Sequence, residues 1–258
     1  MNQHSTTTGK IWWIIYPVLM YYAFMIVTMF CAQLIFGNED KMYMLCKIIA
    51  SLVTLVVISR FYRADVALRG ELGTFWNACK VQVVPLLFAL GIMAFLSIGV
   101  NNVLAMSGLM EWSDSFKDAS DGFFGGNLVI QILSAVVVTP VLEEMLHRGI
   151  VFGRVGELLG AKAAILISAL IFAALHFNIV QFIYAFLLGL VLAGIKEKTG
   201  KLIYPILCHA LANGIAVLRT ATGVLERTAS GDLWAWVMTL GILVVGVLLA
   251  IGAKKSHS

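Results

Sequence analysis

The 258-residue chain is 60% apolar and only 12% charged, with a mean hydropathy of +0.94. Soluble domains are close to half apolar and a quarter charged, so this composition excludes a soluble globular domain and a disordered chain. The four cysteines share no CxxC spacing and lie in or beside apolar runs, which excludes a disulfide framework. The formal net charge is +4, but no basic block is long enough to bind phosphates, so we expect no nucleic-acid partner. The composition indicates an integral membrane protein in contact with the lipid bilayer.

Eight apolar runs are close to the length that a helix needs to cross a hydrocarbon core of about 30 Å. They cover residues 11–36, 42–59, 81–106, 127–147, 163–177, 179–195, 202–218 and 233–252. The first is too long for the apolar part of a cleavable signal peptide, so we expect it to remain. The fifth and sixth are nearly contiguous and form either a tight hairpin or one broken helix. We predict an all-α, polytopic membrane helix bundle of about eight transmembrane helices, with residues 1–258 as a single integral membrane domain.

The orientation follows from the positions of lysine and arginine, because short cytoplasmic loops carry an excess of both. With eight spans and the N-terminus inside, 13 of these cations fall in inner segments and 4 in outer segments. We therefore predict a multi-pass protein of the cell membrane with both termini in the cytoplasm. The longest outer segment, residues 107–126, is acidic and contains glycines near its end, and we expect a flexible loop without chemistry there.

Several polar residues lie inside the predicted spans, where each charged side chain costs about 2.5–3.5 kcal/mol on insertion scales. Lys47 is near the end of its span, and snorkelling to the interface explains it without a function. The others fall in three spans, and most form pairs four residues apart, which places both members on one helix face. They are Glu143 with His147, Glu144 with Arg148, His209 with Asn213, and the single His176. Pro140 removes a backbone donor and is expected to kink its helix just before the two glutamates.

Depth in the membrane gives a second reason to group these residues. We take Arg154, Lys162 and Lys201 as marks of the inner boundary. With about 1.5 Å of rise per residue, Glu143, His209 and His176 then lie about 16, 12 and 21 Å into the membrane. The three spans therefore bring their polar side chains together near the midplane, and Arg148 is the buried partner of Glu144.

Such a group of residues has the parts needed to hydrolyse an amide or an ester. A carboxylate in a low dielectric becomes a better proton acceptor, so Glu143, beside His176, could activate water. Glu144 would stay ionised against Arg148, and His209 and Asn213 would donate hydrogen bonds to the oxyanion. No G-x-S-x-G motif is present, and no serine or cysteine is placed as a nucleophile.

A divalent metal such as zinc is the alternative way to activate water. The candidate ligands are Glu143, His176 and His209, since two imidazoles and one carboxylate form a common catalytic zinc set. The usual H-E-x-x-H string is absent, so the sequence leaves the metal open.

The three motifs together resemble those of a known family. In order and spacing, Glu143-Glu144-x-x-x-Arg148, Phe172-x-x-x-His176 and His209-x-x-x-Asn213 are similar to the motifs of the CPBP family of intramembrane proteases. This family includes the type II CAAX prenyl endopeptidases and the bacterial Abi proteins. The resemblance covers about residues 140–215 and implies an eight-helix membrane protease, in which Glu143 and His176 activate water and His209 and Asn213 stabilise the oxyanion. It also implies that Glu144 and Arg148 support the site and that Phe172 lines its cavity.

We interpret residues 127–218 as the catalytic core of an intramembrane endopeptidase acting on a peptide or a membrane-anchored protein. The main alternative is a non-catalytic membrane regulator or bacteriocin-immunity protein of the same fold. A proton-coupled transporter is a third hypothesis, since glutamate and histidine can relay protons across a membrane. The inverted repeats and paired broken helices typical of many transporters are not evident in the sequence.

The orientation can be tested by labelling single cysteines in a cysteine-free background with a membrane-impermeant reagent. A cysteine near Asp118 should react from outside intact cells, and one near Arg69 should react only after the membrane is permeabilised. A reporter fused after Lys255 should be active in the cytoplasm. Labelling of position 69 from outside would contradict the prediction and invert the protein.

Overall fold

The computed structural model describes residues 6–37, 39–71, 79–124 and 126–255. Within these ranges the chain is helical and contains no strand. The part that is described has seven helices long and apolar enough to cross a membrane, judged by length and composition. An eighth apolar helix, α10 (Ala161–Ala174), has 14 residues. The prediction of an all-α polytopic bundle of about eight helices is confirmed.

The long helices follow the predicted spans closely. They are α1 (Thr7–Phe36), α2 (Asp40–Leu68), α4 (Val83–Met106), α11 (Ile179–Thr199), α12 (Ile203–Thr222) and α13 (Leu233–Lys255). A short 3₁₀ turn, η3 (Glu226–Ala229), links α12 to α13. Apolar side chains remain exposed on the outer helices, as on Leu34 and Val237, because lipid rather than protein is their expected neighbour.

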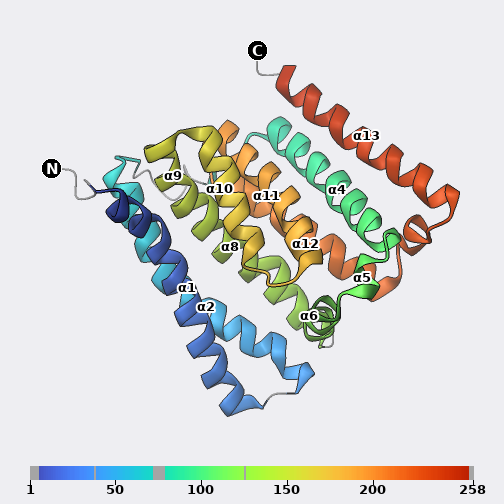
Figure 1. Ribbon diagram of the computed structural model, residues 1–258, viewed down its shortest axis with the longest axis horizontal. Coiled ribbons are helices and arrows are strands. Elements are labelled where there is room, and N and C mark those ends of the chain that lie inside the picture. The colour runs from blue at the N-terminus through green and yellow to red at the C-terminus, as the bar shows by residue number, and fades with distance from the viewer. Residues whose placement is uncertain (1–5, 38, 72–78, 125, 256–258) are drawn as a thin grey trace.

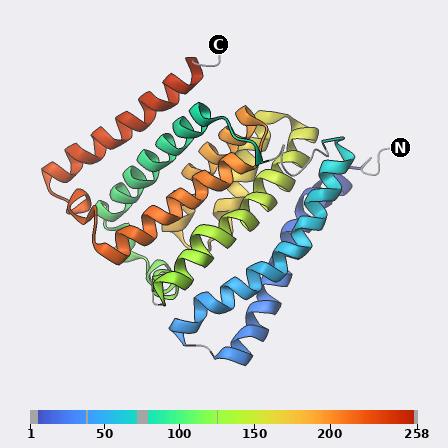
Figure 2. The same cartoon turned by 180° about the vertical axis from the view of Figure 1, so that it is seen from behind.

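The helices are arranged so that the polar residues lie in the middle of the bundle. The α1–α2 pair lies on one side and the α4–α13 pair on the other, with α8 to α12 between them (Figure 1). Seen from behind, α12 runs between α4 and the helix of the fourth span (Figure 2). One buried apolar cluster joins α1 and α2 to the fourth span and α10, and a second joins α4 to α11 and α12.

The fourth span is one long helix with two π-helical segments. It runs continuously over Leu128–Leu159, and so extends well beyond the predicted end at residue 147. Its parts are α7 (Leu128–Gln131), η1 (Ile132–Val138), α8 (Thr139–Glu144), η2 (Met145–Val151) and α9 (Phe152–Leu159). The π-helical segments η1 and η2 flank Glu143 and Glu144, and such segments occur frequently at functional sites. The disturbance expected at Pro140 thus takes the form of a π-helical turn directly before it.

The part of this helix beyond its predicted end carries Arg154. Its guanidinium is 1% exposed and forms a two-point ion pair with Asp65 of α2, with Nε 2.7 Å and Nη2 2.9 Å from the carboxylate oxygens. It also donates to the hydroxyl of Tyr16 and the carbonyl of Trp13, both on α1. These groups neutralise and solvate the charge, so Arg154 is buried in protein rather than exposed to water. The depth of about 16 Å assigned to Glu143 from it stays a prediction.

The fifth and sixth predicted spans form a tight hairpin rather than one broken helix. The turn between α10 and α11 includes Phe177, which has a φ of 57°, a region that bulky side chains rarely adopt. Asn178 caps α11 by accepting a hydrogen bond from the backbone of Gln181. On the other side, the hydroxyl of Tyr22 on α1 donates to the carbonyl of Leu175 at 3.0 Å. The turn is therefore held from two directions.

The segment 107–126 is not the flexible loop that we predicted. Two helices, α5 (Leu109–Trp112) and α6 (Asp114–Phe124), occupy most of it, and Gly125 lies outside the described residues. The side chain of Asn127 then caps the fourth span by accepting from Val129. An acidic residue at the start of α6 favours the helix through the helix dipole, which the composition argument did not weigh.

Candidate functional site

A buried ion pair lies at the centre of the polar group. Nη1 of Arg148 donates to Oε1 of Glu144 at 2.9 Å, and neither side chain is exposed. A second guanidinium nitrogen of Arg148 donates to the carbonyl of Gly189 on α11 at 3.0 Å. A Cβ at this glycine would lie 3.2 Å from that nitrogen, so the absence of a side chain lets α11 approach closely. The predicted pairing of Glu144 with Arg148 is present, and it ties the fourth span to α11.

His209 from α12 lies between the two glutamates. Its Nδ1 is 2.8 Å from Oε1 of Glu144, and its Nε2 is 3.8 Å from Oε2 of Glu143. A buried carboxylate that is paired with Arg148 acts as an acceptor, so Nδ1 of His209 carries the hydrogen of this bond. Glu144 therefore faces Nδ1 of the His209 ring, and the adjacent Glu143 faces Nε2 of the same ring. Glu144 is fully buried, whereas the side chain of Glu143 keeps 16% exposure.

Phe172 of α10 is the apolar centre around which these groups are packed. Its ring lies edge-on to His176 and His209, with centroid separations of 5.0 and 5.7 Å. The guanidinium carbon of Arg148 stands 4.6 Å from the same centroid, a distance typical of a cation–π contact. The ring is 4% exposed. Phe172 therefore keeps water from the ion pair and fixes the spacing between the imidazoles.

His176 is oriented by its own helix. Its Nδ1 donates to the carbonyl of Phe172 at 2.9 Å, because a carbonyl oxygen can only accept. In the neutral ring, Nε2 then has a free lone pair. The ring of Phe172 contacts both His176 and His209. The structure therefore places His176 beside the residues around the glutamates.

Asn213 lies one turn beyond His209 on α12. Its Nδ2 donates to the backbone carbonyl of Ala135 in η1 at 2.8 Å. This bond uses one of the two hydrogens of the amide. Asn213 thus connects α12 to the part of the fourth span that precedes the glutamates. Sequence spacing did not indicate this contact.

His147 belongs to the site although we had not included it among the six candidates. It is 2% exposed, and its Nδ1 donates to the backbone carbonyl of Glu143 at 2.8 Å. Its ring lies 5.0 Å from that of Phe172. The spacing of four residues from Glu143 was the available signal. It indicated a shared helix face but not a bond to the backbone.

The donors do not fit a metal ion. Among the described residues, no three His, Cys, Asp or Glu side chains converge as a metal centre requires. The Nδ1 atoms of His176 and His209 are already bonded to a carbonyl and a carboxylate. Such bonds orient metal ligands and water-activating histidines alike, so they do not by themselves favour zinc. We therefore describe no step through a metal.

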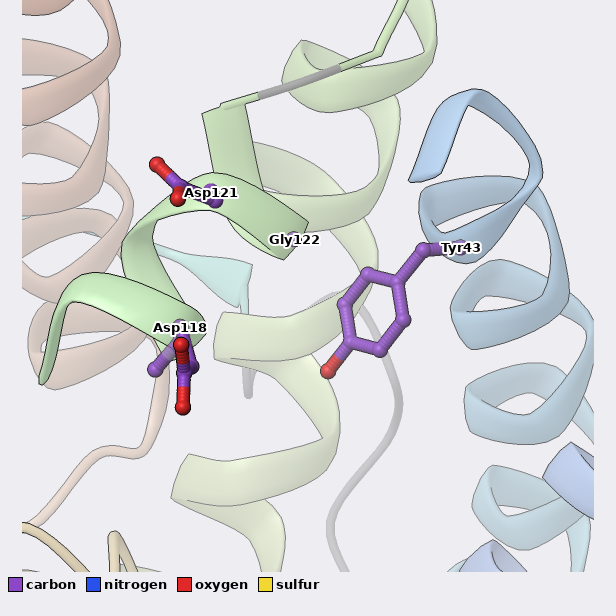
Figure 3. A pocket seen from close by; sticks show the side chains of 5 residues that line it. Tyr43, Asp118, Asp121 and Gly122 are labelled. Atoms are coloured by element: carbon purple, nitrogen blue, oxygen red, sulfur yellow. The ribbon is translucent and has the colours of Figure 1, made fainter. Parts of the chain in front are cut away.

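A separate cavity of about 400 Å³ lies between the start of α2 and α6. Figure 3 shows Tyr43 reaching from α2 toward Gly122, with Asp118 and Asp121 on the same short helix. This cavity is lined by none of the six residues predicted to form the site, which are Glu143, Glu144, Arg148, His176, His209 and Asn213. The candidate site is therefore the buried group around Phe172.

Comparison with known proteins points to the segment that carries this group. Residues 125–215 match the model of the family described as Type II CAAX prenyl endopeptidase Rce1-like. The resemblance to the CPBP family is confirmed over this segment. A Bacillus subtilis (strain 168) protein named "Putative membrane peptidase YdiL" is 29% identical over 89 residues. The match covers 34% of this chain and 36% of that relative, so it spans about a third of each protein. No solved structure matches the chain.

We expect Arg148→Ala to lower the unfolding temperature of the protein. The change leaves the buried Glu144 without its cation, and breaking such a pair costs about 3–5 kcal/mol. Removing both partners in Arg148→Ala with Glu144→Ala should recover part of the loss, because no isolated charge remains. Thermal unfolding of the purified variants in detergent measures both effects. An Arg148→Ala protein as stable as the wild type would show that this pair does not support the fold.

Proposed function

We propose that the chain is an intramembrane endopeptidase that uses Glu143 and His176 to activate water. The observation that supports this best is the unequal environment of the two adjacent glutamates. Glu144 is fully buried and bonded to both Arg148 and His209, so its charge is neutralised. Glu143 keeps partial exposure, and within the described part of the chain His209 is the only basic side chain within 4 Å of its carboxylate. One carboxylate is thus fixed as structure, and the other is left to accept a proton.

The reaction begins with a water molecule between Glu143 and the scissile carbonyl. Glu143 takes one proton from the water as its oxygen bonds to the carbonyl carbon, and the free Nε2 of His176 orients the other hydrogen. The separation of 3.8 Å between Glu143 and Nε2 of His209 is longer than a direct hydrogen bond and can be bridged by one water. Glu143 then returns its proton to the nitrogen of the leaving amine as the carbon–nitrogen bond breaks.

Two donors from α12 stabilise the negative charge that develops on the substrate oxygen. With Nδ1–H of His209 directed at Glu144, Nε2 of the protonated ring is the donor that remains for the substrate oxygen. The second hydrogen of the Asn213 amide is not used by the bond to Ala135. Donors preorganised in a site shielded from water stabilise an oxyanion more strongly than donors in water.

For the substrate, we propose a peptide or a membrane-associated protein. Two points support this: the matched family is described as CAAX prenyl endopeptidases, and the relative carries the name of a membrane peptidase. Residues 127–218 would be the catalytic core, in a multi-pass chain with both termini in the cytoplasm. Neither the scissile bond nor a prenyl group on the substrate is part of the proposal.

Glu143→Gln should reduce hydrolysis by at least about 100-fold, because the amide keeps the shape of the side chain but cannot accept a proton from water. Comparing the protein termini of cells that carry wild type or Glu143→Gln should reveal the cleavage products that disappear. Glu197→Gln is the matched control, since Glu197 is exposed near the end of α11. It should leave the termini unchanged. Wild-type cleavage by a well-folded Glu143→Gln protein would contradict the proposed mechanism.

Chelation tests whether a metal takes part. With Glu143 and His176 as the activating pair, cleavage should survive exhaustive treatment with a chelator, and elemental analysis should find far less than one zinc per chain. A stoichiometric zinc that is lost in both His176→Ala and His209→Ala would contradict this. It would turn Glu143 from a base into a ligand.

A further inference from the structure

The starting point is a gap in the backbone hydrogen bonds of the fourth span. η1 is π-helical, a segment in which N–H groups bond to the carbonyl five residues earlier, and at its end the N–H of Thr139 bonds in this way to the carbonyl of Ser134. The next bond in this series would join position 140 to the carbonyl of Ala135. Position 140 is proline, which has no N–H. The fully buried Ala135 therefore needs a different donor for its carbonyl, since an unpaired carbonyl in hydrocarbon costs several kcal/mol.

We propose that Asn213, besides the oxyanion contact of its second amide hydrogen, positions its helix, because its side-chain amide replaces the hydrogen bond that Pro140 cannot make. Nδ2 of Asn213 is 2.8 Å from the Ala135 oxygen. A backbone acceptor, unlike a side-chain acceptor, cannot rotate away. The bond therefore fixes the level of α12 against the fourth span.

A second proline shows the same arrangement independently. Pro17 lies in the interior of α1, where its missing N–H would have bonded to the carbonyl of Trp13, four residues earlier. That carbonyl accepts a hydrogen bond from Nη1 of Arg154, on α9. The other two prolines, Pro85 and Pro205, lie in the first turn of α4 and α12, where no carbonyl is freed in the helix interior. Both interior prolines thus expose a carbonyl that a side chain from another helix occupies.

This attachment matters for the site because His209 is one turn away on the same helix. The fourth span and α12 are joined at two points, by Asn213 to Ala135 and by His209 to Glu144. Two attachment points fix both the translation and the rotation of α12. Loss of the first should therefore loosen the contact of His209 with Glu144. The link to catalysis rests on the proposed function, whereas the link to the backbone is testable without any substrate.

The test is a double-mutant cycle between positions 140 and 213 in the full-length protein. Asn213→Ala should lower the unfolding temperature by about 2–12 °C, because it leaves the buried carbonyl of Ala135 without a donor. Pro140→Ala restores a backbone N–H in this turn, so the loss caused by Asn213→Ala should shrink to less than half in that background. Pro17→Ala, the same change at the other interior proline, is the control and should not reduce the loss.

A spectroscopic measurement separates positioning from stability alone. In ¹⁵N-histidine NMR spectra, the ring nitrogens of His209 should shift in Asn213→Ala and return toward wild type in Pro140→Ala with Asn213→Ala. If Asn213→Ala alone does not accumulate, recovery of folded protein by Pro140→Ala but not by Pro17→Ala gives the same answer. The proposal would be overturned if Asn213→Ala lowered the unfolding temperature equally in the wild-type, Pro140→Ala and Pro17→Ala backgrounds. Unchanged His209 resonances would also overturn it. A lack of cleavage activity with the coupling intact would count against the protease and not against the role of Asn213.

Discussion

The carboxylate of Glu144 is the interaction on which the rest of the site depends. One buried oxygen accepts from Arg148 of its own helix and from His209 of α12, and Arg148 continues to the backbone of α11. Without its cation this charge could not exist inside a membrane helix bundle. Because three helices meet at it, the pair also determines where the neighbouring Glu143 is held. The buried charge of Glu144 therefore positions the partly exposed Glu143.

In lipid, apolar side chains do not drive helices together, so specific packing and polar contacts must determine the arrangement. This chain shows three such contacts at different levels of the fourth span: Asn213 with Ala135, Glu144 with Arg148 and His209, and Arg154 with Asp65. Two of them use carbonyl groups exposed by prolines, at Ala135 and Trp13. Two of these contacts involve the π-helical segments themselves, since η1 contains Ala135 and η2 contains Arg148.

Local spacing made part of this architecture predictable. The lengths of the apolar runs predicted the helices, and the spacing of four residues predicted the pairing of Glu144 with Arg148. Contacts between distant segments were not predictable, since nothing in sequence spacing relates Asp65 to Arg154 or Asn213 to Ala135. The burial of Arg154 against Asp65 was missed for this reason, because spacing gives no signal for a partner on another helix. The π-helical turn η1 escaped prediction because the missing donor of Pro140 permits either a kink or a wider turn, and nothing in the sequence signals η2.

The hydroxyl of Tyr22 on α1 holds the turn that carries His176, although α1 lies entirely outside the segment of residues 125–215 that matches the family. That turn contains the unfavourable backbone angle of Phe177, whose ring lies against Tyr22 at a centroid separation of 6.0 Å. The segment that resembles its relatives is therefore not self-sufficient. If it were grafted into another helix bundle, the motifs and the Asn178 cap would be intact, but the histidine turn would lose its hydrogen bond from Tyr22. A chimaera that takes residues 125–215 from this chain would therefore also need its helix α1.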